Sequence, residues 1–502
     1  MYYVPIVFTN IPFPLYLIEI LTKVKKNKKN MLKLNKDILY LIFEQLQNDK
    51  NTLYLCLTVN KIWCEIIVLI LWKNPWKYLN DGKEKSLFNI ITSHISAESK
   101  SNLNSKGIHF MMTQYRRPFF DYINLCKHLN LNEINRIIEM IYFLQEDSTI
   151  SNIKIVIFNL LINENARFTH LYIPREFDYQ IHLIPGAKYC FSQLEFLHCN
   201  TSINTNVLIG LAGMCDTMRK LELCIEKFDN NREIVRLIET PKKLYNVYFL
   251  TNIEIDEPFC EIIENSLIKH SNNIQWFKIT KQPTTNILSS LKNLRILELD
   301  DKFRQMKWDC LINLSLPYLQ ILKSRSVPNN VLASLIENTK GFLTDIVIDF
   351  TDFLDDDISN NRLIRAIYKN CPILEYLLLN INTLNILEMK SLLINCQYLN
   401  GLVIVCFVRD QTTWDKIFEL LINYAPKNLF KFKFVSDFEC KLESLKNFFD
   451  NWKHRKSMSL QIHEMHFTDD YFNLIEKYIK NGIVKNFRYD LSNIFFDEFD
   501  WN

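Results

Sequence analysis

The chain carries two hydrophobic patterns, one over residues 34–79 and another over residues 166–490. In the first pattern apolar residues recur every three or four positions, which predicts short amphipathic helices. In the second, a short strand-like alternation recurs many times, and helix-like stretches separate its copies. We therefore divide the chain into a leader without predicted order (1–33), a helical module (34–79), a helical connector (80–165), a repeat array (166–490) and a C-terminal tail (491–502).

The helical module begins at Leu34, with Asn35 as a suitable N-cap and Asp37 in the first helical turn. Two further apolar runs follow, over residues 53–59 and 62–72. Three short helices bury too little apolar surface to be stable by themselves. We therefore expect this module to bind a partner.

The order of apolar, acidic and tryptophan positions in this module resembles an F-box. One position departs from the family pattern, because Asn35 stands where a proline usually follows the first leucine. The resemblance implies docking to the Skp-family adaptor of a cullin-RING ubiquitin ligase. The candidate adaptor contacts that it implies are Leu34, Asp37, Ile42, Leu46, Leu53, Leu57 and Trp72. Spacing leaves open which of them face the partner and which pack internally, and an unrelated helical bundle is the alternative.

In the repeat array the strand-like unit reads apolar, two variable, apolar, one variable, apolar. The clear copies start at Phe168, Leu194, Met218, Leu244, Ile274, Leu294, Leu319, Leu343, Leu374 and Leu399, and weaker ones at Leu429, Ile462 and Val484. Their spacing averages about 26 residues, within the range of leucine-rich repeats. The segment 370–379, NCPILEYLLL, resembles the cysteine-containing leucine-rich repeat of F-box proteins, and the Asn/Lys/Ile-rich composition resembles the large fungal sets of such proteins.

The predicted fold class is therefore α/β: a three-helix F-box, a helical connector and a βα solenoid of leucine-rich repeats. The alternative, an ordinary doubly wound α/β domain, would need glycine-rich turns. The chain has only 8 glycines, and none of them forms a G-x-G motif. The same scarcity argues against a phosphate-binding loop.

One position of each repeat is expected to face outward on the concave side of the sheet, between the last two apolar residues. These positions are Tyr172, His198, Glu222, Tyr248, Lys278, Glu298, Lys323, Val347, Leu378, Val403, Lys433, His466 and Arg488. Three consecutive ones, Val347, Leu378 and Val403, are apolar, and Lys323 and Lys433 flank them. An exposed apolar run with a charged rim predicts a docking patch for a substrate protein. The alternative, that a loop or the C-terminal tail covers these strands, stays open.

Composition narrows the function further. A net charge of +3 makes no case for nucleic acid, and the apolar start of the chain is interrupted by prolines, so no membrane span is expected. The 13 cysteines form no C-x-x-C pair, which indicates reduced thiols and a cytoplasmic or nuclear location. His463 and His466 could suggest a metal-binding pair, but in a strand their side chains would point to opposite faces. We expect no metal, no cofactor and no catalytic residue.

Together these features predict a substrate-recognition subunit of an SCF-type ubiquitin ligase, which is not itself an enzyme. The F-box resemblance implies a Skp-family adaptor and, through it, cullin and RING subunits as partners. The repeats would bind an unknown protein substrate. The alternative function is that of a leucine-rich-repeat interaction scaffold without ligase engagement, and Asn35 is the departure that motivates it.

Overall fold

The computed structural model describes residues 35–79, 81–105, 118–251, 256–301, 306–349, 357–407, 412–436, 440–463 and 467–490. The chain separates into two compact units, Met1–His128 and Leu129–Asn502. We had placed the boundary of the repeat array at residue 166. The second unit begins earlier, because the helices of residues 131–161 pack with the repeats that follow them.

The N-terminal unit opens with three helices and a 3-10 turn: α2 (Lys36–Gln45), α3 (Lys50–Cys56), α4 (Lys61–Lys73) and η1 (Pro75–Tyr78). Each begins at an Asn or Asp whose side chain accepts a hydrogen bond from a backbone N–H of the first turn. Asn35 is the N-cap of α2, as predicted. Asn35 therefore starts the helix by capping it.

One apolar cluster holds these helices together. Leu39 and Phe43 of α2, Leu53 of α3 and Ile67 of α4 are at most 7% exposed in it. The Phe43 and Trp63 rings meet edge to face, with centroids 4.9 Å apart. Burial of this kind stabilises by about 25 cal/mol per Å² of apolar surface, so a cluster this small gives a marginal unit.

Three more helices follow in the same unit: α5 (Glu84–Thr92), α6 (Ala97–Ser105) and α7 (Tyr122–Leu125). Residues 97–107 are polar in composition, which is typical of a loop. A helix forms instead, because Ser96 Oγ accepts a hydrogen bond from the Ser99 backbone N–H at 3.1 Å and Leu103 is buried. Capping and one apolar anchor outweigh the weak helix propensity of this stretch.

The second unit is a βα solenoid, as predicted. In the part of the chain that the structure describes, fourteen strands form one sheet in strict sequence order. The pairings recorded from β2 to β14 are all parallel. The strands are β1 (His128–Asn130), β2 (His170–Tyr172), β3 (Phe196–Asn200), β4 (Lys220–Ile225), β5 (Asn246–Thr251), β6 (Trp276–Ile279), β7 (Ile296–Asp300), β8 (Ile321–Arg325), β9 (Asp345–Asp349), β10 (Tyr376–Asn380), β11 (Gly401–Val405), β12 (Lys431–Val435), β13 (Met458–His463) and β14 (Val484–Asp490).

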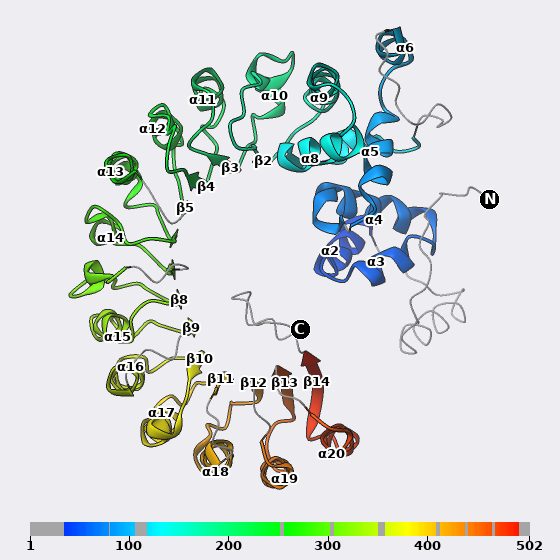
Figure 1. Cartoon of the computed structure of the whole chain (residues 1–502). Helices are drawn as coiled ribbons and strands as arrows, with labels where there is room; N and C mark the ends of the chain where they lie inside the picture. The colour runs from blue at the N-terminus through cyan, green and yellow to red at the C-terminus, as the bar shows by residue number, and fades with distance from the viewer. Residues whose placement is uncertain are drawn as a thin grey trace. The chain divides into compact units, whose positions relative to one another are not determined.

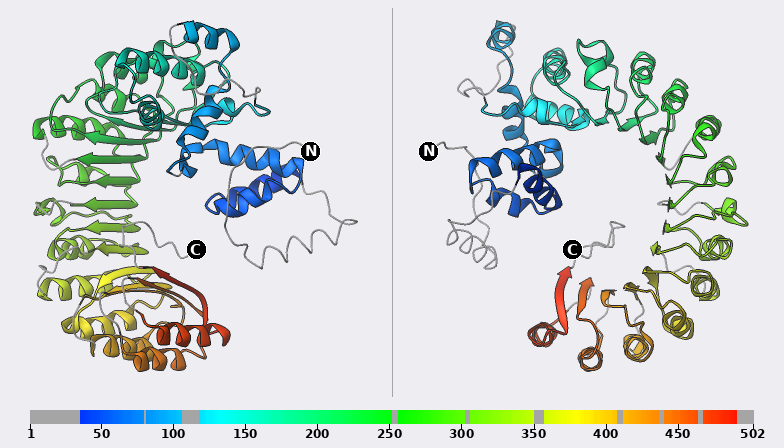
Figure 2. Two further views of the ribbon diagram at one scale, coloured as in Figure 1. Left: turned by 45° about the vertical axis from the view of Figure 1, so that its right-hand side comes forward. Right: turned by 180° about the vertical axis from the view of Figure 1, so that it is seen from behind.

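Helices connect successive strands. In this unit the strands lie side by side along the inner face and the helices along the outer face (Figures 1 and 2). The α-helices are α8 (Leu131–Ile141), α9 (Asp147–Leu161), α10 (Ala187–Cys190), α11 (Thr205–Ala212), α12 (Ile234–Glu239), α13 (Glu257–Ser266), α14 (Ile287–Ser290), α15 (Asn329–Glu337), α16 (Asp357–Asn370), α17 (Ile386–Asn395), α18 (Thr412–Tyr424), α19 (Leu442–Asn451) and α20 (Asp469–Lys480). Shorter 3-10 turns are η2 (Ile181–Leu183), η3 (Leu267–His270), η4 (Asp309–Leu311) and η5 (Thr383–Asn385).

The sheet is in register, so equivalent positions of neighbouring repeats lie side by side. An inward row of apolar side chains runs through Leu197, Leu221, Val247, Phe277, Leu297, Leu322, Ile346, Leu377, Leu402, Phe432 and Leu460, each at most 3% exposed. This row forms the core between the sheet and the helices. No repeat could bury it alone, which is why the units are stable only when stacked.

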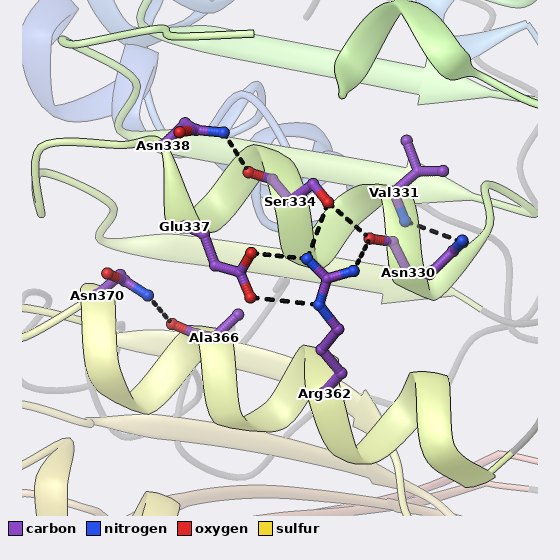
Figure 3. A network of polar contacts seen from close by, with 8 residues as sticks. All are labelled: Asn330, Val331, Ser334, Glu337, Asn338, Arg362, Ala366 and Asn370. Carbon is purple, nitrogen blue, oxygen red and sulfur yellow. Dashed lines mark hydrogen bonds and ion pairs between the residues drawn. The ribbon is translucent and has the colours of Figure 1, made fainter. Parts of the chain in front are cut away.

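Neighbouring helices are also joined by polar contacts. Arg362 of α16 donates to both carboxylate oxygens of Glu337 of α15, at 2.7 and 3.3 Å, and to Ser334 Oγ at 3.0 Å (Figure 3). Farther along, Arg365 of α16 donates to Glu388 of α17 at 2.6 Å. These contacts fix the spacing of adjacent repeats on the helical side.

Cysteines serve as small apolar residues of the repeats. Cys371 and Cys396, which precede strands β10 and β11, are fully buried, and none of the 13 thiols is in a disulfide. Burial raises the pKa of Cys396 to about 12. The Cys396 thiol therefore stays protonated and unreactive at neutral pH. Among the helices described, none has the length and apolar composition that would be needed to cross a membrane.

Candidate functional site

The first candidate surface is an apolar face of helix α2. Ile38, Leu41 and Ile42 are 47%, 59% and 45% exposed. They recur at three- and four-residue steps and so share one side of the helix. Leu39 and Phe43, on the opposite side, are buried in the core of the unit. We call Ile38, Leu41 and Ile42 the α2 apolar face.

Helix α4 also exposes large apolar side chains. Ile62 and Leu69 are 45% and 42% exposed and lie seven positions apart, again on one side of their helix. Two ion pairs tie this helix to α2: Lys36 Nζ lies 3.3 Å from Glu65, and Lys73 Nζ lies 3.3 Å from Glu44. The two helices therefore hold their exposed apolar side chains in a fixed arrangement.

The predicted adaptor contacts separate into four groups. Asp37 and Ile42 are exposed, whereas Leu53 is 0% exposed and belongs to the core, so the prediction of a contact at Leu53 is wrong. Leu34 lies outside the described residues. The remaining three are partly buried against the core cluster: Leu46, Leu57 and Trp72.

The side chain of Trp72 packs inside the N-terminal unit, although the sequence suggested it as an adaptor contact. Its ring stacks at an angle on Tyr122, with centroids 4.3 Å apart.

Sequence analysis missed the exposed apolar residues Ile38, Leu41, Ile62 and Leu69 as candidate contacts. Helix α2 is apolar on two sides, and this was the available signal, but periodicity alone does not tell which side faces the core.

The second candidate surface is the concave face of the sheet. The column that we expected to face outward is in register from Tyr172 on β2 to Lys433 on β12. On β13 the prediction is wrong by several residues: this strand spans Met458–His463, so Gln461 occupies the column in place of His466. The apolar alternation continues past His463 in the sequence and gave the wrong phase; His466 itself lies outside the described residues. On β14 the prediction is confirmed, because Arg488 pairs with Gln461.

The first half of this column is a ladder of charges. His198 Nδ1 lies 3.3 Å from Glu222, and Glu298 receives Lys278 at 3.3 Å and Lys323 at 3.4 Å. Burial would raise the pKa of Glu222, but the hydrogen bond with His198 and the nearby lysines outweigh it, so that the pKa is lowered. Glu222 is therefore ionised at neutral pH. Both Glu222 and Glu298 already have partners within the column.

The second half of the column does not form the exposed apolar patch that we expected. Val347 and Val403 are only 8% and 2% exposed, and Leu378 is partly buried. Val403 packs in a cluster with Val405 and Val435, against which Leu378 and Phe407 also lie. Lys323 and Lys433 do lie beside Val347 and Val403 in the register. Substrate binding there stays a prediction, but Val347 and Val403 offer little surface for it.

Comparisons with known proteins leave the family open. No family model matches the chain, and no curated protein matches it. A similar solved structure is described as the crystal structure of the Rad7 and Elc1 complex in yeast. The identity is 16%, the match covers 70% of this chain and 85% of that chain, and the TM-score is 0.38. The strand order and register described above by themselves make the second unit a parallel βα-repeat solenoid.

Proposed function

We propose that this chain is a substrate-recognition subunit of an SCF-type ubiquitin ligase. The N-terminal unit would bind a Skp-family adaptor, which in turn carries cullin and RING subunits, and the solenoid would hold a target protein. The observation that carries the proposal is the α2 apolar face, with Ile38, Leu41 and Ile42 each about half exposed.

Such exposure is costly for a small helical unit. Each large apolar side chain left in water forgoes about 1.5–3 kcal/mol of burial free energy. Clustered apolar exposure on a soluble unit marks an interaction surface, and interface energy concentrates in a few such anchors. The F-box-like order of residues in the same unit names the kind of partner.

In this role the chain has no catalysis of its own. It would raise the local concentration of the target at the ligase and orient it, while other subunits transfer ubiquitin. The proposal places the chain in the cytoplasm, the nucleus or both, where such ligases act.

Adaptor binding tests the proposal. We expect wild-type protein to co-purify with a Skp-family adaptor and the double variant Leu41→Lys/Ile42→Lys to lose at least about tenfold in affinity, since two anchors are charged. The matched control is Leu384→Lys/Leu387→Lys on η5 and α17, where the same residue types are 64% and 78% exposed in the other unit. The control should bind like wild type, and both variants should keep the wild-type melting temperature.

An interaction scaffold without ligase engagement is the second candidate. Asn35 favours it, because this residue replaces the proline expected at the start of the F-box. If folded wild-type protein does not bind the adaptor, the scaffold function is the better one. If the α2 variant binds as tightly as wild type, the α2 apolar face is not the docking site.

A further inference from the structure

A lysine on the concave face lies among aromatic rings and has no carboxylate partner among the residues that the structure describes. Lys220 of β4 places its Nζ 4.4 Å from the ring centroid of Tyr248, 4.9 Å from that of Phe196 and 5.9 Å from that of Trp276. These residues come from strands β3 to β6, and Lys220, Phe196 and Trp276 belong to the same row of the register. Four successive repeats therefore build one site.

The neighbouring carboxylates are already engaged. Glu222 is paired with His198, and Glu298 is shared by Lys278 and Lys323. Burial lowers the pKa of Lys220, although the charges of Glu222 and Glu298 oppose the change. The ammonium group of Lys220 has thus lost water without gaining a paired anion from the described part of the chain.

Two further donors at this site are unsatisfied. The hydroxyl of Tyr248 and the Nε1 of Trp276 are buried and have no hydrogen-bond partner among the residues described. Tyr248 is only 7% exposed, and burial raises its pKa, so its hydroxyl keeps its proton and can donate. A buried donor without an acceptor costs about 1–3 kcal/mol. The two rings that carry these donors pack together, with centroids 5.2 Å apart.

From these contacts we infer that Lys220, Tyr248 and Trp276 form a recognition site for a carboxylate side chain, Asp or Glu, of an acidic segment in the target protein. The inference deepens the proposed function and rests on it, because it names what the repeats would hold. A carboxylate accepts several hydrogen bonds, and its single negative charge would pair with the ammonium group of Lys220.

Charge decides between a carboxylate and a phosphate. The concave ladder around the site holds three lysines (Lys220, Lys278, Lys323) against two glutamates (Glu222, Glu298), which come from strands β4, β6, β7 and β8. One negative charge neutralises the excess. A phosphate would bring nearly two charges beside Glu222 and Glu298, and like charges repel.

The test measures binding of short capped peptides to the full-length protein. The probe is a fluorescent peptide of alternating glutamate and glycine, compared with the same peptide carrying glutamine or phosphoserine in place of glutamate. We expect the glutamate peptide to bind and the glutamine peptide to bind at least about tenfold more weakly, because a charge-assisted hydrogen bond is lost. Binding of the glutamine peptide at equal strength, or of the phosphoserine peptide alone, would overturn the inference, as would no binding to folded protein.

Four variants locate the site. Lys220→Met keeps the stem that packs on the rings but removes the charge, and should lose at least about tenfold in affinity, whereas Lys220→Arg should retain binding. Tyr248→Phe removes one donor and should weaken binding about threefold to tenfold. The matched control is Lys390→Met, since Lys390 lies 4.7 Å from the Tyr424 ring centroid on the helical side, and it should bind like wild type. Unchanged binding by Lys220→Met would overturn the inference.

Adaptor binding, measured on the same preparations, separates the two proposals. Lys220→Met should keep adaptor binding and lose the peptide. If the adaptor does not bind but the glutamate peptide binds in a Lys220-dependent way, the ligase function fails and the carboxylate site stands.

Discussion

A bidentate ion pair between Arg362 and Glu337 joins two successive repeats. The guanidinium of Arg362 on α16 donates from Nη2 to Glu337 Oε2 at 2.7 Å and from Nε to Oε1 at 3.3 Å. The same guanidinium donates to Ser334 Oγ and to the carbonyl of Asn330, so it contacts three residues of α15 (Figure 3). Interfaces between neighbouring repeats carry much of the stability of a solenoid.

We predict that the Arg362–Glu337 pair contributes a measurable coupling energy. The two side chains are 44% and 41% exposed, so the expected coupling is about 0.5–1 kcal/mol, since solvent screens the pair but its geometry is bidentate. A double-mutant cycle of Arg362→Met and Glu337→Gln in urea unfolding measures it. The control pair, Lys480 and Glu476 on α20, is 77% and 66% exposed and should show almost none. Equal coupling energies in both pairs would mean that the bidentate geometry of the Arg362–Glu337 pair adds no stability.

Leu53 and Leu41 should respond oppositely to truncation. Leu53→Ala removes a fully buried side chain and should destabilise the N-terminal unit by about 2–5 kcal/mol. Leu41→Ala, at a 59% exposed position, should change stability by less than about 0.5 kcal/mol but weaken adaptor binding. Hydrogen exchange of residues 35–79 reports the first effect, and adaptor affinity the second. Stability loss in Leu41→Ala would place that side chain in the core.

Charging Val403 should damage the solenoid. Val403→Asp would place a carboxylate in the buried cluster with Val405 and Val435, where it would have to leave water or open the cluster. We expect a lower melting temperature, whereas Leu387→Asp, at a position 78% exposed, should leave it unchanged. If the Val403→Asp protein has the melting temperature of wild type, Val403 is exposed, and the docking patch predicted from the sequence is supported.

His270 should make stability depend on pH. Its Nε2 donates to the Ile238 carbonyl at 2.9 Å, and burial lowers its pKa. The folded state therefore takes up the proton at lower pH than the unfolded chain. Stability should be complete above the usual histidine pKa of about 6.5 and be lost as pH falls below it toward the folded-state value.

The variant His270→Gln keeps a donor for Ile238 but does not titrate. We expect its stability to fall less than that of wild type between about pH 7 and about pH 5. His454→Gln, at an exposed position, serves as the control and should follow wild type. Parallel pH profiles for wild type and His270→Gln would show that His270 does not carry the dependence.

Local features were predictable because they depend on neighbouring residues. Asn35 caps α2 through the backbone N–H of Asp37, two positions away. The outward column from Tyr172 to Lys433 followed from strand alternation and is confirmed by the register. Prediction failed at β13, where the sequence from Met458 alternates in a way that fits two phases, and only pairing with β12 selects one.

The exposure of individual apolar side chains was less predictable, because it also depends on contacts between distant parts of the chain. Helix α2 presents apolar residues on two sides, and packing against α4 decides that Leu39 and Phe43 are buried while Ile38, Leu41 and Ile42 are not. At the other end, Val403 occupies an outward position of its strand and is buried all the same, because Val405 and Val435 pack on it. Burial depends on neighbours that are distant in the chain.

The sequence alone therefore determined the repeat architecture, since the inward apolar residues and the caps of short helices act over a few positions. Only the tertiary structure decided which apolar side chains remain exposed on α2. It also decided that Lys220 lies among Phe196, Tyr248 and Trp276, with no carboxylate partner in the residues described. Those residues come from four different repeats. Stacking of the strands brings them together, and no local pattern encodes the distance between their side chains.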